Sequence, residues 1–289
     1  MKLLVYGAGV AGSVFAVQMH EAGHDVSLLA RGERLAALRR HGVQLAERDN
    51  PVRRVPVPVV EEPAGEYDLI AVLVRAHQVE AVLEALADVR GDVLFLLNWA
   101  AGAEPLGAVL GHDRVLLGFP VAGGTVDGDV IRHRGATLLS RLVTMSIGEP
   151  GGGTTPRTDR ILRALRTAGI KAKVEPRMAA WLTTHAAFEV PLGQAVAAAG
   201  GPVALAGDPA AVRDMLRLMR RNLAALPAPP VPRAFRALQT LPEWLLIVVL
   251  RRFLRSATAV HSGLSSTSPA AAAELERLAE QLRAGAKAR

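Results

Sequence analysis

The chain has 289 residues, of which 50% are hydrophobic and 21% are charged. This composition is typical of a folded globular protein long enough for two domains, and it argues against extensive disorder. The sequence contains no cysteine, which excludes disulfides, thiolate nucleophiles and cysteine-ligated metals. The formal net charge is +7, but the basic residues are mostly arginines spread along the chain and aromatic residues are scarce. We therefore predict no nucleic-acid partner.

The start of the chain and the lengths of its apolar runs bear on its cellular location. Met1 and Lys2 run directly into LLVYGAG, without the apolar run and small-residue cleavage site of a signal peptide. The longest apolar run, Leu245 to Leu250, is much shorter than the roughly 20 residues that cross a bilayer. These observations predict a cytoplasmic protein with no membrane partner.

The first half of the chain alternates short apolar runs with helical patterns, which predicts a parallel sheet covered by helices. A turn at Asp127-Gly128, followed by VIRHR and LVTMSIG, predicts an antiparallel extension of this sheet. A glycine-rich loop is expected at 151–153. The expected strands are 3–7, 25–30, 69–74, 93–97, 115–119 and 170–174, and the expected helices are 14–22, 33–41, 79–87 and 158–168.

From Pro176 onward the pattern changes to Ala, Leu, Met and Arg at helical spacing, interrupted by prolines at 227–232. We predict a Rossmann-type α/β domain over residues 1–174 and an all-helical domain for substrate binding and dimerisation over residues 175–289. The tail from Pro269 predicts one amphipathic helix with Leu275, Leu278 and Leu282 on one face. The apolar stretch from Pro242 to Phe253 is compatible with a homodimer interface and equally with a buried core helix.

The sequence GAGVAG lies between the first expected strand and the first expected helix, which is the context in which G-x-G-x-x-G binds a dinucleotide. Gly7 permits the tight turn, Gly9 lets the backbone approach the pyrophosphate, and Gly12 permits close packing of helix and strand. The N-terminus of the helix faces the phosphate charge. The predicted cofactor-binding turn comprises Gly7, Ala8, Gly9, Val10, Ala11 and Gly12.

The end of the second strand indicates which nucleotide is bound. NAD-selective sites place a carboxylate there for the ribose 2′-hydroxyl, whereas an arginine suits a 2′-phosphate. The strand ends in Leu28-Leu29-Ala30-Arg31-Gly32, so Arg31 predicts NADP(H) as the cofactor. Glu33 is the alternative carboxylate, but it follows a glycine where a helix begins and fits that helix terminus better.

Beyond this turn, the order of landmarks over most of residues 1–150 resembles the ketopantoate reductase family. The matching stretches are YGAGVAGSVFAVQMHEAGHDVSLLARGERLAALRRHGVQL, LVRAHQVEAVLEAL, LLNWAAGAEPL and LLGFPVAGGTVDGDVIRH. The resemblance implies that Arg75, where the family usually has lysine, lies near the adenosine phosphate, and that Gln78 lies over the cofactor.

The resemblance also implies that Asn98 closes over the nicotinamide side and hydrogen-bonds cofactor or substrate. A simple loop cap is the alternative for Asn98, because asparagine is a common turn residue. The usual glycine neighbour is replaced by Trp99, so we expect a bulkier and more apolar floor there.

The second domain departs from the family. The family has W-x-K on its first helix, whose lysine acts as general acid, followed by two asparagines. Here Thr183 stands at the lysine position, with Ala187 and Val190 or Pro191 at the asparagine positions. A threonine hydroxyl is a poor acid at neutral pH and supplies no positive charge.

The same helix carries His185 and Glu189 four residues apart on one face. A carboxylate beside an imidazole stabilises its protonated form, so His185 is a candidate proton donor near neutral pH. The alternative is a structural histidine in the domain interface, because the pair lies off the face of Thr183.

Near the C-terminus the resemblance implies a serine and then a glutamate that holds the hydroxyl end of the substrate. Glu274-Leu275-Glu276 fits the glutamate pattern, the serine falls within Ser262 to Ser268, and His261 is an unaligned candidate. Glu274 is equally compatible with a solvent-facing position in the first turn of the last helix.

Three functions follow from these patterns. The first is an NADPH-dependent reductase of a C=O or C=N group of a small molecule other than ketopantoate, with Asn98, Thr183 or Thr184, His185 and Glu274 in the site and no metal. A protonated imine would need no lysine. The second is a nucleotide-binding protein without hydride transfer that serves in binding, sensing or a non-redox biosynthetic step. The third, ketopantoate reduction with a rearranged site, is disfavoured by the missing lysine.

Overall fold

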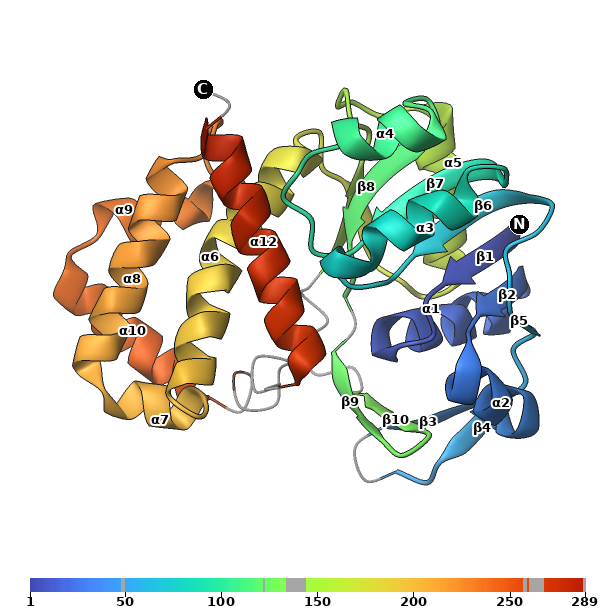
Figure 1. Cartoon of the computed structure of the whole chain (residues 1–289), viewed down its shortest axis with the longest axis horizontal. Coiled ribbons are helices and arrows are strands. Elements are labelled where there is room, and N and C mark those ends of the chain that lie inside the picture. Colours follow the sequence, from blue (N-terminus) through green and yellow to red (C-terminus); the bar gives the residue numbers. More distant parts are fainter. Residues whose placement is uncertain (48–49, 122, 134–143, 257–258, 260–267, 288–289) are drawn as a thin grey trace. The chain divides into compact units, whose positions relative to one another are not determined.

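The computed structural model describes the chain except residues 48–49, 122, 134–143, 257–258, 260–267 and 288–289 (Figure 1). Two compact units make up the chain. The first comprises Met1–Leu97 and Ala103–Met178, and the second comprises Asn98–Gly102 and Ala179–Arg289. The short segment Asn98–Gly102 therefore belongs to the second unit although its sequence neighbours belong to the first.

An eight-stranded sheet forms the centre of the first unit, in the order β12-β11-β8-β7-β6-β1-β2-β5. From β5 to β8 the neighbouring strands are parallel, and β11 is antiparallel to β8. The order β5-β2-β1-β6-β7-β8 is that of dinucleotide-binding folds, which confirms the predicted fold class. The strands are β1 (Lys2–Tyr6), β2 (Asp25–Leu29), β5 (Val59–Val60), β6 (Glu66–Val72), β7 (Arg90–Leu96), β8 (Val115–Phe119), β11 (Met145–Gly148) and β12 (Ala172–Val174).

Helices cover this sheet, and its central strands are apolar and buried over most of their length, as expected for parallel strands buried on both faces. Leu3 and Val5 of β1 share one buried cluster with Phe15 of α1 and Ile161 and Leu165 of α5, whereas α3 and α4 are seen in front of the sheet in Figure 1. The helical elements are α1 (Val10–Glu21), α2 (Gly32–His41), η1 (Ala76–Gln78), α3 (Val79–Leu86), α4 (Glu104–Leu110) and α5 (Pro156–Thr167).

A second sheet of four strands corrects one prediction. The hairpin of β9 (Gly124–Asp127) and β10 (Val130–His133) forms at the expected turn, but β10 pairs with β3 (Val43–Glu47), and β4 (Arg53–Val55) completes a separate sheet. Only β11 extends the large sheet antiparallel, as expected. Fully buried Ile131 of β10 packs in one cluster with Val43 and Leu45 of β3. The hairpin therefore pairs with β3 because of side-chain packing between segments distant in sequence. The remaining residues of VIRHR and LVTMSIG, within 134–143, lie outside the described part.

The described part of the second unit beyond Ala179 is helical, as predicted. Its helices are α6 (Met178–Ala198), α7 (Pro202–Gly207), α8 (Pro209–Ala224), η3 (Arg233–Phe235), α9 (Arg236–Thr240), α10 (Glu243–Leu254) and α12 (Pro269–Lys287). Asp208 caps α8 by accepting hydrogen bonds from Ala210 N and Ala211 N. On α6, a Cβ at Gly193 would lie 2.7 Å from Leu275 Cδ1, so α12 packs closely there.

The helix α10 has one buried and one exposed apolar face. Leu246, Ile247, Leu250 and Leu254 belong to the core, whereas Trp244 is 69% and Val248 58% exposed. The Pro242–Phe253 stretch is therefore a core helix that also presents apolar surface. Among the described residues, no helix combines the length and the apolarity that a membrane crossing needs.

Candidate functional site

The glycine turn between β1 and α1 has the geometry that a dinucleotide requires. Gly7 has φ +116°, and a Cβ there would lie 2.4 Å from Leu73 O. A Cβ at Gly12 would lie 1.8 Å from Gly7 O, so helix and turn approach too closely for a side chain. At Gly9, by contrast, nothing lies within 4 Å of the Cβ position. The turn is therefore tight where it packs and open at the start of α1, where backbone N–H groups attract phosphate.

The carboxyl ends of β1, β2 and β6 meet at one edge of the sheet because these three strands are adjacent and parallel. The chain leaves β1 and β6 in opposite lateral directions, which is the position where α/β sheets bind nucleotides. Gly7, Arg31 and Arg75 follow these strand ends. The predicted cofactor residues thus come to one edge, and their contacts with a nucleotide remain a proposal.

Arg31 precedes α2 as its N-cap residue and is exposed. Its Nη2 donates to Tyr6 Oη at 3.1 Å, and its guanidinium lies 5.9 Å from the centre of the Tyr6 ring. Tyr6 ends β1 and is itself buried, so it holds Arg31 over the strand ends. Glu33 lies in the first turn of α2, as expected.

Gln78 has a local structural role. Its Oε1 accepts a hydrogen bond from Arg75 N at 3.0 Å, which shapes the short helix η1 after β6. A position of Gln78 over the cofactor remains a prediction.

Sequence reasoning missed Arg34, in the first turn of α2. Its Nε donates to Ala8 O of the glycine turn at 3.2 Å, and its Nη1 donates to Asp129 O at 3.1 Å. The available signal was its spacing, one helical turn after Arg31, which keeps a second cation near the strand ends.

A polar cluster in the second unit joins three segments that are distant in sequence. Asn98 Nδ2 lies 3.3 Å from Glu189 Oε1 on α6 and 3.5 Å from Glu274 Oε1 on α12. The oxygen of the same amide, Asn98 Oδ1, is buried without a hydrogen-bond partner among the described residues. Asn98 therefore contacts side chains of two helices, and the alternative of a simple loop cap does not describe these contacts.

The histidine–glutamate pair forms as predicted. His185 Nε2 lies 2.8 Å from Glu189 Oε2, and both side chains are about one-quarter exposed, at 24% and 25%. The ring of Trp181 stacks on His185 with 5.2 Å between centroids and 13° between planes. The stacked ring of Trp181 and the Nε2–carboxylate contact hold the imidazole beside the Asn98–Glu189 contact. This position is compatible with a proton donor and with a structural histidine.

The hydroxyls of both candidate threonines are bonded to backbone. Thr183 Oγ1 donates within α6, with Ala179 O and Ala180 O each at 3.1 Å. The fully buried Thr184 donates to Ala180 O at 2.7 Å and accepts from Val231 N at 3.1 Å. These bonds give Thr184 a structural role, and the catalytic role of Thr183 remains a prediction.

The surroundings of Asn98 are partly as expected. Trp99 is only 4% exposed and its Nε1 donates to Gly102 O at 2.6 Å. Gln281 Oε1 of α12 accepts from Ala100 N at 2.8 Å. A buried tryptophan and a buried glutamine therefore fix the segment Asn98–Gly102 within the second unit.

Two C-terminal expectations have different outcomes. Since α12 begins at Pro269, Glu274 does not lie in its first turn and is partly buried, so the solvent-facing first-turn alternative is wrong. Ser268 Oγ accepts from Ala271 N at the start of α12. His261 and the serines from Ser262 to Ser266 lie outside the described residues.

Among the residues that the structure describes, no group of three or more potential metal ligands occurs.

Comparison with known proteins shows the family of the first part of the chain. Residues 3–142 match the model described as ketopantoate reductase PanE/ApbA. The chain is therefore similar to this family over a little less than half of its length. Its curated relatives include the 2-dehydropantoate 2-reductase of Archaeoglobus fulgidus, 28% identical over 60% of this chain and 55% of the relative. That of Pyrococcus horikoshii is 24% identical over 63% of this chain and 58% of the relative. The chain thus spans little more than half the length of these relatives.

Solved structures show the same fold over the whole chain. The 2-dehydropantoate 2-reductase of Geobacter metallireducens has a TM-score of 0.69 at 16% identity, with 100% of both chains covered. A D-mandelate dehydrogenase with NADH and anilino(oxo)acetate has a TM-score of 0.70 at 16% identity, covering 98% of this chain and 99% of that chain. A dimeric ketopantoate reductase of Staphylococcus aureus has a TM-score of 0.71 at 14% identity, covering 100% and 92%.

The ketopantoate reductase match divides the predicted site residues into two groups. Within residues 3–142 lie the glycine turn, Arg31, Arg75, Gln78 and Asn98, whereas the candidates from α6 and α12 lie beyond it. Ketopantoate reductases use NADPH, which agrees with the predicted cofactor. The family match therefore supports the cofactor side, and the acceptor side must be argued from the polar cluster.

Proposed function

We propose that this protein is an NADPH-dependent reductase of a C=O or C=N group of a small molecule other than ketopantoate. The first unit supports this with an open glycine turn and with Arg31 after β2, the position where an arginine suits a 2′-phosphate in dinucleotide-binding folds. The observation that carries the proposal is the contact of the Asn98 amide with both Glu189 and Glu274. It gathers two positions implied by the family resemblance, Asn98 and Glu274, and the further carboxylate of Glu189 into one cluster.

The cluster is rich in hydrogen-bond acceptors. Carboxylates only accept hydrogen bonds when ionised, and Asn98 Oδ1 is a further buried acceptor with no donor among the described residues. Buried polar groups are normally hydrogen-bonded, so an orphaned acceptor favours a ligand that donates. A substrate with N–H groups or a positive charge satisfies this cluster better than a carboxylate does.

A protonated imine fits both the acceptors and the missing lysine. Bound NADPH supplies a hydride. Transfer of that hydride to an iminium carbon would turn the π electrons of the C=N bond into the lone pair of a neutral amine, so no proton donor would be needed. Glu189 and Glu274 would stabilise the positive charge of the iminium, and the Asn98 carbonyl would orient its N–H.

Reduction of a carbonyl needs a proton for the developing alkoxide, and His185 is the candidate donor in this cluster. Its Nε2 contact with Glu189 holds the ring, and the stacked Trp181 fixes its plane. The C=O reaction thus depends on His185, whereas the C=N reaction does not.

The test is NADPH consumption with a panel of small keto acids, amino ketones and cyclic imines, followed by the absorbance of reduced nicotinamide. We expect turnover with cationic or imine acceptors, a loss of at least about tenfold in kcat/KM for Glu189→Gln and Glu274→Gln, and little change for Glu276→Gln. Glu276 is an exposed glutamate on the same helix and serves as the matched control. Consumption confined to anionic keto acids would contradict the acceptor assignment.

The second function, nucleotide binding without hydride transfer, predicts a different result in the same assay. NADPH would then bind tightly with no consumption across the panel.

A His185→Gln variant separates the two reductase reactions, because it should lose ketone reduction and retain imine reduction.

A further inference from the structure

We propose that Arg34 is a positioning residue that fixes the glycine turn in the conformation that receives the pyrophosphate. This inference rests on the proposed function in that it takes NADPH as the ligand of this turn. Arg34 belongs to neither the glycine motif nor the strand-end position that selects the nucleotide, and its contacts lie entirely within the first unit.

One guanidinium connects three segments. Its Nε donates to Ala8 O of the turn at 3.2 Å, its Nη2 lies 3.4 Å from Ser13 Oγ of α1, and its Nη1 donates to Asp129 O beyond β9 at 3.1 Å. Ser13 is fully buried, and its hydroxyl also donates to Ala8 O at 3.1 Å. The Ala8 carbonyl is thus held by two donors from two different helices.

The direction of this carbonyl determines the direction of the next amide. In a trans peptide the C=O and the following N–H point in opposite directions. Because Ala8 O faces Arg34 and Ser13, the N–H of Gly9 points away from both. Gly9 is also the residue of the motif with nothing within 4 Å of its Cβ position. Arg34 therefore orients the peptide that faces the open side of the turn.

The charge of Arg34 is placed to strengthen these bonds. The side chain is partly buried, and desolvation lowers the pKa of its guanidinium, an effect that Asp129 opposes. A charge-assisted hydrogen bond to a backbone carbonyl is stronger than a neutral one, and more so away from bulk water. Arg31, by contrast, bonds the Tyr6 side chain and holds no backbone of the turn among its described contacts.

The two arginines should therefore have different effects on nucleotide binding. Pyrophosphate is common to NADPH and NADH, whereas the 2′-phosphate is present only in NADPH. We expect Arg34→Ala and Ser13→Ala to raise the Kd of both nucleotides by a similar factor, on the order of tenfold. Arg31→Ala should raise the Kd of NADPH selectively. Arg39→Ala should change neither, because Arg39 lies on the same helix but contacts exposed Glu61 at 3.9 Å.

The experiment is a titration of each purified variant with NADPH and with NADH, followed by the fluorescence of bound reduced nicotinamide. Hydrogen exchange of the peptide containing Gly9 and Val10, measured without nucleotide, gives a second readout. We expect faster exchange in Arg34→Ala than in the wild type and in Arg39→Ala. If Arg34→Ala folds poorly, Arg34→Lys provides the comparison, because one ammonium can reach Ala8 O but cannot span all three contacts. The nucleotide Kd of Arg34→Lys should lie between those of Arg34→Ala and the wild type.

Two results would overturn the inference. Wild-type Kd values for both nucleotides together with unchanged exchange would show that Arg34 does not position the turn. A loss of NADPH affinity alone would show that Arg34 binds the 2′-phosphate directly. If the wild type binds neither nucleotide, the proposed function fails instead, and the exchange experiment still decides whether Arg34 holds the turn.

Discussion

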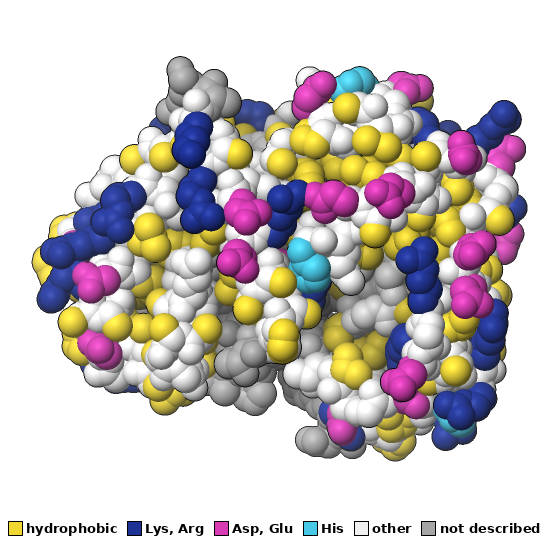
Figure 2. Space-filling view, in the orientation of Figure 1, with side chains coloured by type: hydrophobic (Ala, Val, Ile, Leu, Met, Phe, Trp, Pro, Cys, Tyr) yellow, Lys and Arg dark blue, Asp and Glu magenta, His cyan; other side chains and the backbone are white. Residues whose placement is uncertain are grey.

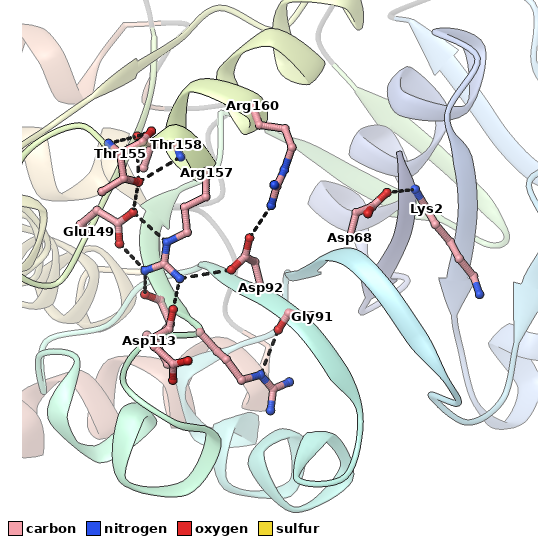
Figure 3. A network of polar contacts seen from close by, with 12 residues as sticks. Lys2, Asp68, Gly91, Asp92, Asp113, Glu149, Thr155, Arg157, Thr158 and Arg160 are labelled. Carbon is pink, nitrogen blue, oxygen red and sulfur yellow. Dashed lines mark hydrogen bonds and ion pairs between the residues drawn. The ribbon is translucent and has the colours of Figure 1, made fainter.

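Glu149→Gln should destabilise the first unit by about 3 kcal/mol near neutral pH. Glu149 is 7% exposed and lies after β11, where it accepts from Arg157 Nε at 2.8 Å and from Thr155 Oγ1 at 2.5 Å, with a further contact to Arg157 Nη2 (Figure 3). Because β11 runs antiparallel to β8, its end meets the beginnings of β7 and β8. The same Arg157 bonds Asp92 at 3.2 Å in β7 and Val115 O at 3.3 Å in β8.

The magnitude follows from what the substituted side chain retains. A glutamine at this position would still accept from Thr155, but it would lose the charge that faces the guanidinium and place an NH2 group against it. Hydrogen bonds to charged groups contribute about 1.5–3 kcal/mol each, and removing one partner of a buried pair costs about 3–5 kcal/mol. The lower end of the range for a broken buried pair applies here, because Asp92 remains as a second partner of Arg157. For a unit of this size, a loss of about 3 kcal/mol corresponds to a fall in Tm of roughly 6–12 °C.

The deficit should depend on pH with a definite sign. Burial by itself raises the pKa of Glu149, but the hydrogen bonds from Arg157 and Thr155 outweigh burial and leave the pKa below its ordinary value. A carboxylate with a lowered pKa stabilises the folded state above its unfolded pKa, about 4.3 for glutamate, and this stabilisation is lost as pH falls through the folded pKa. The wild type and Glu149→Gln should therefore differ fully at neutral pH and converge in acid.

Glu21→Gln is the matched control for this substitution. Glu21 also forms a two-contact pair with an arginine, Arg53, but the side chains are 44% and 53% exposed. Exposed pairs contribute about 1 kcal/mol or less. All three tryptophans lie in the second unit, so denaturant titrations followed by tryptophan fluorescence report the helical unit and far-UV circular dichroism reports both. Equal losses for the two variants, or a Glu149→Gln deficit that does not shrink as the pH falls below the unfolded pKa of glutamate, about 4.3, would refute the reasoning.

Three further predictions concern other parts of the chain. Gly12→Ala should weaken NADPH binding by roughly 100-fold or more, because its Cβ would lie 1.8 Å from Gly7 O; a variant with wild-type affinity in the nucleotide titration would contradict the tight turn. Thr184→Val should lower stability by about 1–3 kcal/mol by leaving Val231 N without its acceptor, whereas Thr184→Ser should recover most of it in denaturant titrations. We also propose a homodimer through the exposed face of α10. Trp244→Glu should then give monomers in sedimentation velocity, whereas the control Val203→Glu, at an exposed valine of α7, should stay dimeric. A monomeric wild type would exclude this interface.

The elements of the large sheet could be predicted because their signals are local. Apolar runs bounded by glycine identified β1, β2, β6, β7 and β8 within a few residues, and the glycine turn identified the edge of the sheet that the nucleotide uses. The strands β3 and β4 were missed because polar residues interrupt them, and β5 was missed because it has only two residues. All three form by pairing with other segments. For the same reason the β9–β10 hairpin was assigned to the wrong sheet.

Charge on the visible surface also agrees with the composition. Figure 2 shows Lys and Arg side chains interspersed with acidic and apolar ones on that face. A positive net charge by itself identifies no particular partner.

The polar cluster shows why sequence patterns identified candidates without identifying the chemistry. His185 and Glu189 are one helical turn apart, and their pairing follows from helix geometry alone. Asn98 lies 91 residues before Glu189 and 176 before Glu274, and no periodicity connects such positions. These residues meet because the segment Asn98–Gly102 belongs to the helical unit. The buried Trp99 and the hydrogen bond from Ala100 N to Gln281 hold the segment there.

This arrangement changes what the loss of the lysine means. By the family resemblance, Asn98 and Glu274 stand at family positions, whereas Thr183 stands where the family has lysine. Here the retained Asn98 contacts two carboxylates, one of them paired with a histidine, and leaves a buried acceptor oxygen for a ligand. In the proposed function, a ligand that donates hydrogen bonds fits this acceptor oxygen better than one that only accepts them. In the proposed function the absent lysine and the carboxylate of Glu189 favour the same class of substrate, and the Glu189→Gln variant tests this carboxylate separately from Glu274→Gln.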